Sequence, residues 1–200
     1  MRALFKDGGT RHFRWDFAPS WNTQPSATKL SLRFSNQNKG YRPTSATFLY
    51  SGGAFTTTYN DPYMPTDVPI PSTAKRVELW AIITGHGAEA HQCAEFCNHK
   101  HTFTVNDNAH QKTHPEAGTQ SKCEARVPTD AVVPNQAGTW WFGRGGWCPG
   151  MQVDPWVTDV TSEVTPGQNA TITYKGLYGS ATPTEASGNI DMISYLVVYE

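Results

Sequence analysis

The sequence predicts an all-β fold, a sandwich or jelly roll of two antiparallel sheets, and three observations support this. The chain has few charges and many turn residues: 16% of its 200 residues are charged, and it contains 17 glycines and 14 prolines. Several short segments alternate apolar and polar side chains, as half-buried strands do. No window of 11 or more residues has a helical period. Short strands separated by frequent turns are typical of sandwiches and jelly rolls.

The expected strands occur along the whole chain. The clearest is 76–84, in which the odd-numbered residues Val77, Leu79, Ala81 and Ile83 would share one face. Segment 99–106 alternates in the same way. The other expected strands are 29–35, 47–50, 156–160, 170–174 and 192–199. Residues 138–148 are aromatic and rich in glycine, which indicates an ordered loop flanked by a short strand.

The charge balance excludes two classes of partner. Seventeen acidic residues stand against 16 basic ones, so the formal net charge is −1. No field of one sign would attract nucleic acid or an anionic membrane. No apolar run approaches the length of a membrane span. We therefore expect a globular protein without a nucleic-acid partner or a membrane span.

The four cysteines, Cys93, Cys97, Cys123 and Cys148, are expected to form two disulfides. An even count in a turn-rich chain favours an oxidising compartment, secreted or periplasmic. A zinc site is the alternative, but the spacing is loose and contains no CxxC pair. Three pairings are compatible with the sequence. The first residues hold no apolar stretch of signal-peptide length, which predicts that the chain is a piece of a longer product.

A candidate acid or base lies between the first two cysteines. Cys93 and Cys97 would close a very tight loop if they bonded to each other, and Glu95 would be at its tip. A carboxylate presented in this way can act as an acid, a base or a water-orienting group when its surroundings tune its pKa. The alternative is a surface glutamate in a stapled hairpin.

A candidate sugar-binding platform lies in segment 140–150. Arg144 and Trp147 are set among glycines in a loop, where functional residues are common. Flat aromatic faces suit sugar rings, and a guanidinium binds polar groups. The alternative is that Trp140 and Trp141 occupy a strand, with one in the core and the other on the surface.

A candidate metal pair is His99 and His101. Residues i and i+2 of a strand project the same way, so both imidazoles could reach one ion. Met192 could add a thioether ligand, and two imidazoles with a thioether suit copper better than zinc. The alternative is two core histidines hydrogen-bonded to the backbone.

The order of these segments resembles the C-terminal domain of the peptide-N-glycosidase F family. The resemblance covers about residues 45–200 and rests on two specific motifs, Cys-Ala-Glu-Phe-Cys at 93–97 and Arg-Gly-Gly-Trp-Cys-Pro-Gly at 144–150. It implies two jelly rolls side by side with an active site at their interface. It also implies hydrolysis of the amide that joins an N-glycan to asparagine, without a cofactor.

Carried over by position, the resemblance assigns catalysis to Glu95 and Arg144. It places Trp147 and His86 beside the glycan, and we add Phe96 and Trp141 as substrate-binding candidates. Phe96 stands where the family has tryptophan, so it lacks the indole N–H donor. The resemblance also implies the disulfides Cys93–Cys97 and Cys123–Cys148.

The chain departs from the family pattern at its beginning. The family's principal catalytic aspartate belongs to an N-terminal jelly roll, and no aspartate here matches it. We expect residues 1–40 to be the end of that preceding domain or an extension, and residues 41–200 to be the C-terminal jelly roll. The expected function is to hydrolyse the N-glycan–asparagine linkage of glycoproteins. Without its partner domain, the chain would only bind a glycoprotein or oligosaccharide.

Two other functions remain open. The same double jelly roll occurs in the copper-dependent peptidylglycine hydroxylating monooxygenases, whose C-terminal domain binds copper through a His-x-His strand and a methionine. His99, His101 and Met192 stand where such a site would be, so the resemblance implies copper as the alternative cofactor. The last alternative is a non-catalytic structural or adhesive module, because a fold does not fix a function.

Overall fold

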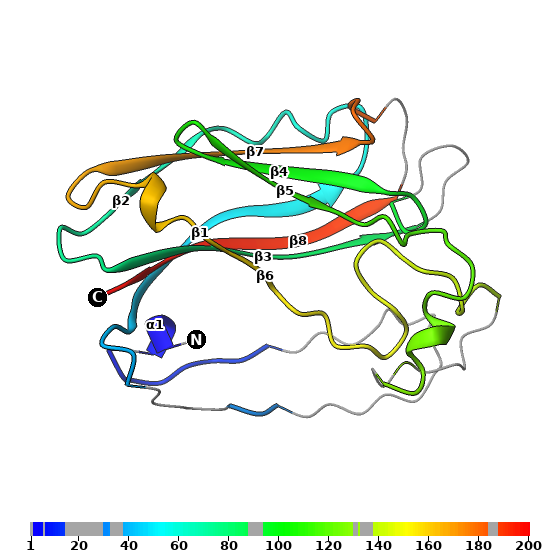
Figure 1. Cartoon of the computed structure of the whole chain (residues 1–200), viewed down its shortest axis with the longest axis horizontal. Coiled ribbons are helices and arrows are strands. Elements are labelled where there is room, and N and C mark those ends of the chain that lie inside the picture. The colour runs from blue at the N-terminus through cyan, green and yellow to red at the C-terminus, as the bar shows by residue number, and fades with distance from the viewer. Residues whose placement is uncertain are drawn as a thin grey trace.

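A computed structural model contains, within the residues that it describes, two antiparallel sheets of four strands each (Figure 1). It describes residues 2–5, 7–14, 30–32, 38–87, 94–129, 132, 138–183 and 188–200. One sheet has the order β1-β8-β3-β6, and the other has the order β2-β7-β4-β5. The strands are β1 (Pro43–Ala54), β2 (Thr66–Pro69), β3 (Arg76–His86), β4 (His99–Val105), β5 (Asn108–Thr113), β6 (Trp156–Asp159), β7 (Asn169–Tyr178) and β8 (Asn189–Tyr199). The predicted all-β class is therefore confirmed.

The pairing relates early strands to late ones. β1 pairs with β8, β2 with β7, β3 with β6 and β4 with β5. Within one sheet β3 also pairs with β8, and within the other β4 also pairs with β7. Each four-stranded layer therefore mixes both halves of the chain. Most of the packing is therefore between residues distant in sequence, and the loops at one end of the sandwich come together from several parts of the chain.

The two sheets share one hydrophobic core. The completely buried apolar side chains of this core come from both layers and include Leu79, Leu196, Val198, Phe103, Val105 and Ile172. The predicted inward face of segment 76–84 is confirmed, because Val77, Leu79, Ala81 and Ile83 are all buried in β3. Burial of apolar surface from both sheets stabilises the sandwich and holds its end loops in place.

The predicted strands differ from the structure in three places. Residues 30–32 are not in a strand, and Leu30 and Leu32 are exposed; the rest of 29–35 lies outside the described residues. Residues 138–148 form turns and bends, as predicted for a loop, but no strand follows before residue 156, and residues 133–137 on the other side lie outside the described residues. β2 and β5 were not predicted, since β2 is only four residues long and β5 is a polar edge strand whose sequence does not alternate.

One disulfide lies within the described residues, between Cys123 and Cys148. These two buried cysteines pack with Val132 in a small second core, apart from the main one. Cys93 lies outside the described residues, so its predicted bond to Cys97 stays a prediction; no described cysteine is free. The Cys123–Cys148 bond ties the 140–150 loop to the turns around residue 123.

We expect the double variant Cys123→Ala/Cys148→Ala to lose about 3 kcal/mol of unfolding free energy, because the bond closes a loop of 25 residues in the unfolded chain. Urea denaturation of the variant and the unmodified protein measures this difference. The same stability for both proteins would contradict the prediction.

The N-terminal part is described only in pieces. Helix α1 (Arg2–Phe5) contacts β1, and the ring centroids of Phe5 and Phe13 are 6.2 Å apart. The division between residues 1–40 and 41–200 stays a prediction. No helix in the described part of the chain is long and apolar enough to span a bilayer.

Candidate functional site

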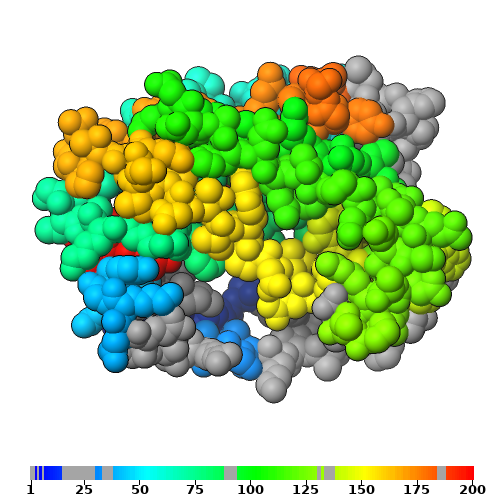
Figure 2. Space-filling model, in the orientation of Figure 1, coloured from blue at the N-terminus to red at the C-terminus, as the bar shows by residue number. Residues whose placement is uncertain are grey.

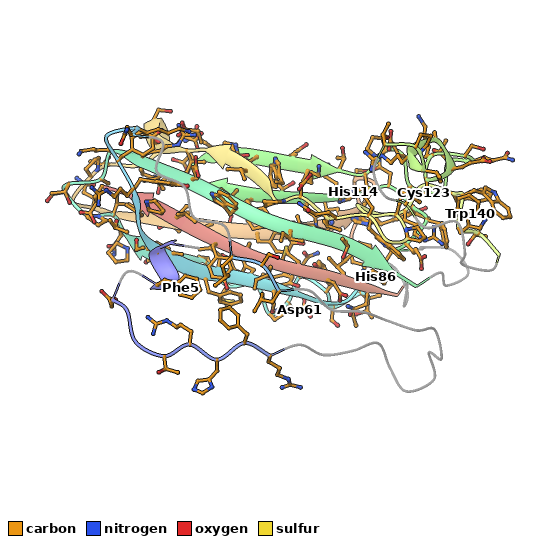
Figure 3. The ribbon with its side chains drawn as sticks, turned by 90° about the horizontal axis from the view of Figure 1, so that it is seen from below. Phe5, Asp61, His86, His114, Cys123 and Trp140 are labelled. Carbon is orange, nitrogen blue, oxygen red and sulfur yellow. A yellow bond between two sulfur atoms is a disulfide. The ribbon has the colours of Figure 1, made fainter. Side chains whose placement is uncertain are left out.

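Three segments that are distant in sequence meet at one end of the sandwich. These segments are the end of β3, the turn before β4 and the 140–150 loop. Figure 3 shows His86, His114, Cys123 and Trp140 at this end. Backbone hydrogen bonds join them: Gly85 N–H donates to the carbonyl of Gly145 at 2.7 Å, and Gly145 N–H donates to that of Glu95 at 2.7 Å. Gly145 thus links the turn that carries Glu95 to the end of β3.

Two glycines allow this close approach. A Cβ atom on Gly85 would lie 1.9 Å from the carbonyl oxygen of Ala94, and one on Gly145 would lie 2.4 Å from Nε2 of His99. Side chains do not tolerate such distances, so the three segments can pack together only because these residues lack a Cβ.

Glu95 and Arg144 form an ion pair at the centre of this end. Arg144 Nε donates to Glu95 Oε1 at 2.6 Å, and Gly87 N–H donates to Oε2 at 3.1 Å. Arg144 Nη1 also donates to the carbonyls of Trp140 at 3.1 Å and Phe142 at 3.3 Å. The Arg144 side chain is 1% exposed, whereas that of Glu95 is 16% exposed. The guanidinium is therefore fixed in place, and part of the carboxylate surface remains open to solvent.

Aromatic rings surround the guanidinium. Its Cζ atom lies 4.9 Å from the Trp147 ring centroid and 5.2 Å from that of Phe96. Trp147 Nε1 donates to the Gly85 carbonyl at 2.8 Å, and the Trp147 and His86 rings are 4.8 Å apart. The predicted neighbours Glu95, Arg144, Trp147, Phe96 and His86 are thus brought together, while their catalytic and binding roles stay predictions.

Trp141 is not brought into this group. Its ring contacts within the described residues are with Trp140 and Phe142, at centroid distances of 6.0 and 5.8 Å. Its carbonyl accepts the N–H of Cys123 at 3.0 Å. The arrangement gives Trp141 a part in holding the loop to the disulfide, and its predicted role in substrate binding stays a prediction.

A pocket of about 350 Å³ lies beside the ion pair. Arg144 and Trp147 form part of its wall, and the other side chains facing it include Trp156, Lys112, Asp154, Glu116, Arg126 and His114. Figure 2 shows the face on which the green segment near residue 115 and the yellow segment near residue 150 lie side by side. The pocket combines a tryptophan face with charges of both signs, a lining suited to a polar ligand that has apolar ring faces.

A buried histidine cluster lies under the same end. His99 and His101 are fully buried, as predicted from the alternation of β4, and His114 is 8% exposed. The ring centroid of His99 is 4.7 Å from that of His101 and 4.8 Å from that of His114. His114 was not predicted. The β4–β5 hairpin brings it here, because the pairing of Lys100 with Thr113 sets His99 opposite His114, and the sequence pattern did not reveal β5.

Burial keeps these imidazoles neutral near pH 7. It lowers the pKa of His99 to about 4, although the nearby Ala94 carbonyl opposes the shift. Burial, followed by the proximity of His99 and Lys112, lowers the pKa of His114 to about 3. The pKa of the fully buried His101 is also well below its ordinary value. A neutral imidazole has one nitrogen lone pair available for a metal or a donor.

Met192 is buried in the main core on β8, where it pairs with Ile83 across the sheet. Among the described histidines, cysteines and acidic residues, His114 is the one that lies close to both His99 and His101. The predicted site that joins the Met192 thioether to His99 and His101 stays a prediction.

Comparison with known proteins relates this site to one family. The family model for the C-terminal part of peptide-N-glycosidase F matches residues 54–197, which include all the segments of the site. A curated relative, the peptide-N(4)-(N-acetyl-β-D-glucosaminyl)asparagine amidase F of Elizabethkingia miricola, is 32% identical over 116 residues. The match covers 54% of this chain and 30% of that protein.

Solved structures support the fold. The glycosylasparaginase PNGase F from Flavobacterium meningosepticum superposes with a TM-score of 0.54 at 17% identity, covering 77% of this chain and 51% of that one. A peptide-N(4)-(N-acetyl-β-D-glucosaminyl)asparagine amidase structure has a TM-score of 0.56 at 17% identity, covering 79% and 53%. PNGF-II has a TM-score of 0.55 at 18% identity, covering 78% and 30%. The chain thus spans about half the length of the first two structures.

Proposed function

The chain belongs to the peptide-N-glycosidase F family through its C-terminal domain, and on that premise we propose that it is the sugar-recognising half of an amidase acting on asparagine-linked glycans. The observation that carries the proposal is the buried Arg144, which joins Glu95 to the Trp147 wall of the pocket. The name of the curated relative specifies an N-acetylglucosaminyl-asparagine amide, and we extend this substrate class to the present chain.

The contacts of Glu95 define what it can do in such a site. Each carboxylate oxygen already accepts one hydrogen bond, from Arg144 or from Gly87 N–H. A carboxylate has about four lone-pair sites. The partly exposed carboxylate therefore retains acceptor capacity for a sugar hydroxyl, an amide N–H or a water molecule. Glu95 would orient one of these groups while Arg144 holds the carboxylate in place.

Arg144 and Trp147 have complementary roles in this proposal. Arg144 is held by two backbone carbonyls and by Glu95, so it positions the loop and supplies positive charge next to the pocket. Trp147 would place an apolar ring face against a sugar, because its indole N–H is already donated to the Gly85 carbonyl. Hydrolysis needs a second acidic group to activate water, which the family resemblance assigns to a preceding domain. We therefore expect the chain alone to bind glycan.

Titration with an N-acetylglucosaminyl-asparagine glycopeptide tests this proposal. We expect the unmodified chain to bind it and Trp147→Ala to bind about fivefold more weakly, since lost aromatic packing is worth about 1 kcal/mol. Glu95→Gln should weaken binding as well, because it removes the charged acceptor. Phe48→Ala, which alters an exposed aromatic on β1, is the matched control and should bind normally. Absence of glycopeptide binding by the unmodified chain would contradict the proposal.

A coupled test addresses catalysis. With a preceding domain of the family joined to the chain, we expect release of glycan from a denatured N-glycoprotein, and no release from the Glu95→Gln form. A folded two-domain protein that binds glycan but releases none would leave the sugar-binding role standing and remove the amidase role.

We further infer that the strand order is that of a jelly roll, since eight strands pair first with last and inward from both ends. The second disulfide, Cys93–Cys97, and a secreted or periplasmic location belong to the same proposal, and both are supported by the absence of free cysteines among the described residues. The copper-dependent alternative and the structural or adhesive alternative remain the competing functions.

A further inference from the structure

The three buried histidines lie on the two strands of one hairpin. His99 and His101 point inward from β4, and His114 follows directly after β5. One potential ligand atom from each of the three side chains lies within 4.8 Å of those of the other two. Nδ1 of His99 and Nε2 of His101 face each other at 2.5 Å. The hairpin register therefore concentrates three imidazoles in one small buried volume.

Two ring nitrogens in this volume make no hydrogen bond of normal geometry, although the Ala94 carbonyl lies near His99. Nε2 of His99 and Nε2 of His114 are the buried side-chain nitrogens that lack a hydrogen-bond partner among the described residues. Buried polar atoms in folded proteins are nearly always paired, so two such atoms in adjacent side chains need an explanation. A bound cation that draws one nitrogen from each ring would provide it after small rotations of the rings.

A pair of tyrosine hydroxyls positions the His101 ring through its Nδ1 atom. Nδ1 of His101 lies 2.6 Å from the hydroxyl of Tyr174, which lies 2.8 Å from the hydroxyl of Tyr59. When Nδ1–H donates to Tyr174, the lone pair of His101 is on Nε2 and points toward His99. Histidine ligands of metals ordinarily donate their second ring nitrogen to such an outer partner, which fixes the tautomer and the ring orientation.

The donor set and the access route define the class of ion. The described members of the cluster are three imidazoles, without a carboxylate or a thiolate. Imidazole nitrogens suit late first-row ions such as Zn²⁺ and Cu²⁺, whereas Mg²⁺ and Ca²⁺ prefer oxygen. His114 also faces the pocket of about 350 Å³, which gives an ion a route from solvent and a fourth position for water or a ligand.

We infer that His99, His101 and His114 form a binding site for one late first-row transition metal ion of the Zn²⁺ type. The site differs from the predicted copper set, because His114 replaces Met192 as the third ligand. It lies next to the Glu95–Arg144 pair, since Gly145 packs against Nε2 of His99. The inference does not depend on the proposed glycan function.

Zinc titration of the metal-free protein tests the site. We expect one Zn²⁺ per chain by calorimetry, a raised melting temperature with Zn²⁺, and an intense visible absorption band with Co²⁺ typical of a four-coordinate site. These three readouts use the unmodified protein, so they do not depend on whether a variant folds. A protein that binds no Zn²⁺ and gives no Co²⁺ band would overturn the inference.

Variants identify the ligands. His114→Gln should weaken Zn²⁺ binding by at least about 100-fold, because loss of even an outer-shell partner costs about 10- to 100-fold. Tyr174→Phe should weaken it by about tenfold for the same reason. His110→Gln is the matched control, since His110 lies on β5 and pairs with Glu163 away from the cluster. Normal binding by a folded His114→Gln protein, or loss of binding in Met192→Leu, would overturn the assignment of His114.

Discussion

Replacement of Arg144 by methionine is expected to lower the free energy of unfolding by about 3 kcal/mol, near the lower end for breaking a buried ion pair. Methionine keeps most of the buried volume but removes the hydrogen bonds to Glu95, Trp140 and Phe142. The Glu95 carboxylate would keep only the Gly87 N–H of its two described partners. Because 16% of the Glu95 side chain is exposed, water can recover part of the loss, so a larger effect is not expected.

Urea denaturation of Arg144→Met, Glu95→Gln and the double variant measures this effect. If the carboxylate is destabilising once it is unpaired, the double variant should be more stable than the sum of the two single changes predicts, because its neutral amide is cheaper to bury. Arg76→Met is a useful control, because it removes a more exposed arginine that pairs with Glu78 and Asp159. Additive effects of the two substitutions at 95 and 144 would show that the pair does not stabilise the fold.

Acidification is expected to destabilise the metal-free protein strongly between pH 6.5 and 4. Burial lowers the pKa of His99 to about 4 and that of His114 to about 3 in the folded protein. The unfolded chain has ordinary histidines with a pKa near 6.5. Between these values the unfolded chain binds more protons than the folded one, so unfolding becomes easier as the pH falls. Each histidine contributes a slope of about 1.4 kcal/mol per pH unit in this window.

Above pH 6.5 these histidines are neutral in both states, and the stability should not depend on their titration. Urea denaturation at pH 7.5, 6 and 5 in the presence of a chelator measures the slope. His114→Gln should show a shallower slope than the unmodified protein by about one proton, because one buried titrating group has been removed. A stability that stays constant from pH 6.5 to 5 would show that these imidazoles are already protonated, or accessible to water, in the folded state.

The parts of the fold that were predictable are those in which one face of a strand is buried. β4 alternates strictly between buried and half-buried residues. In β3 the odd-numbered residues Val77 to Ile83 are all buried, as predicted, although Glu78 and Thr84 on the other face are buried as well. β5 could not be found in this way. It is an edge strand, and the exposure of its side chains leaves a polar sequence without a period. His114 was missed for the same reason, because it follows the strand that the sequence pattern did not reveal.

The sequence predicted which residues belong to the candidate site, but not how they contact one another. The cysteine-flanked Glu95 and the Arg144–Trp147 loop stand out in the sequence, but 49 residues separate Glu95 from Arg144. Their contact depends on Gly85 and Gly145, which leave room for three backbone segments to approach one another. The pocket wall also includes Trp156 of β6 and Lys112 of β5. Both lie outside the two motifs, and nothing in the sequence marks them as pocket residues.

The sequence by itself determined the all-β class, the buried faces of the main strands and the chemical groups available for a site, because each depends on local alternation or on residue type. Only the tertiary structure decided which groups meet. It set Arg144 between aromatic rings and Glu95, and it selected His114 as the third member of the histidine cluster. These contacts join strands and loops that are distant in the chain, and their formation depends on sheet register and close backbone packing, which local patterns do not encode.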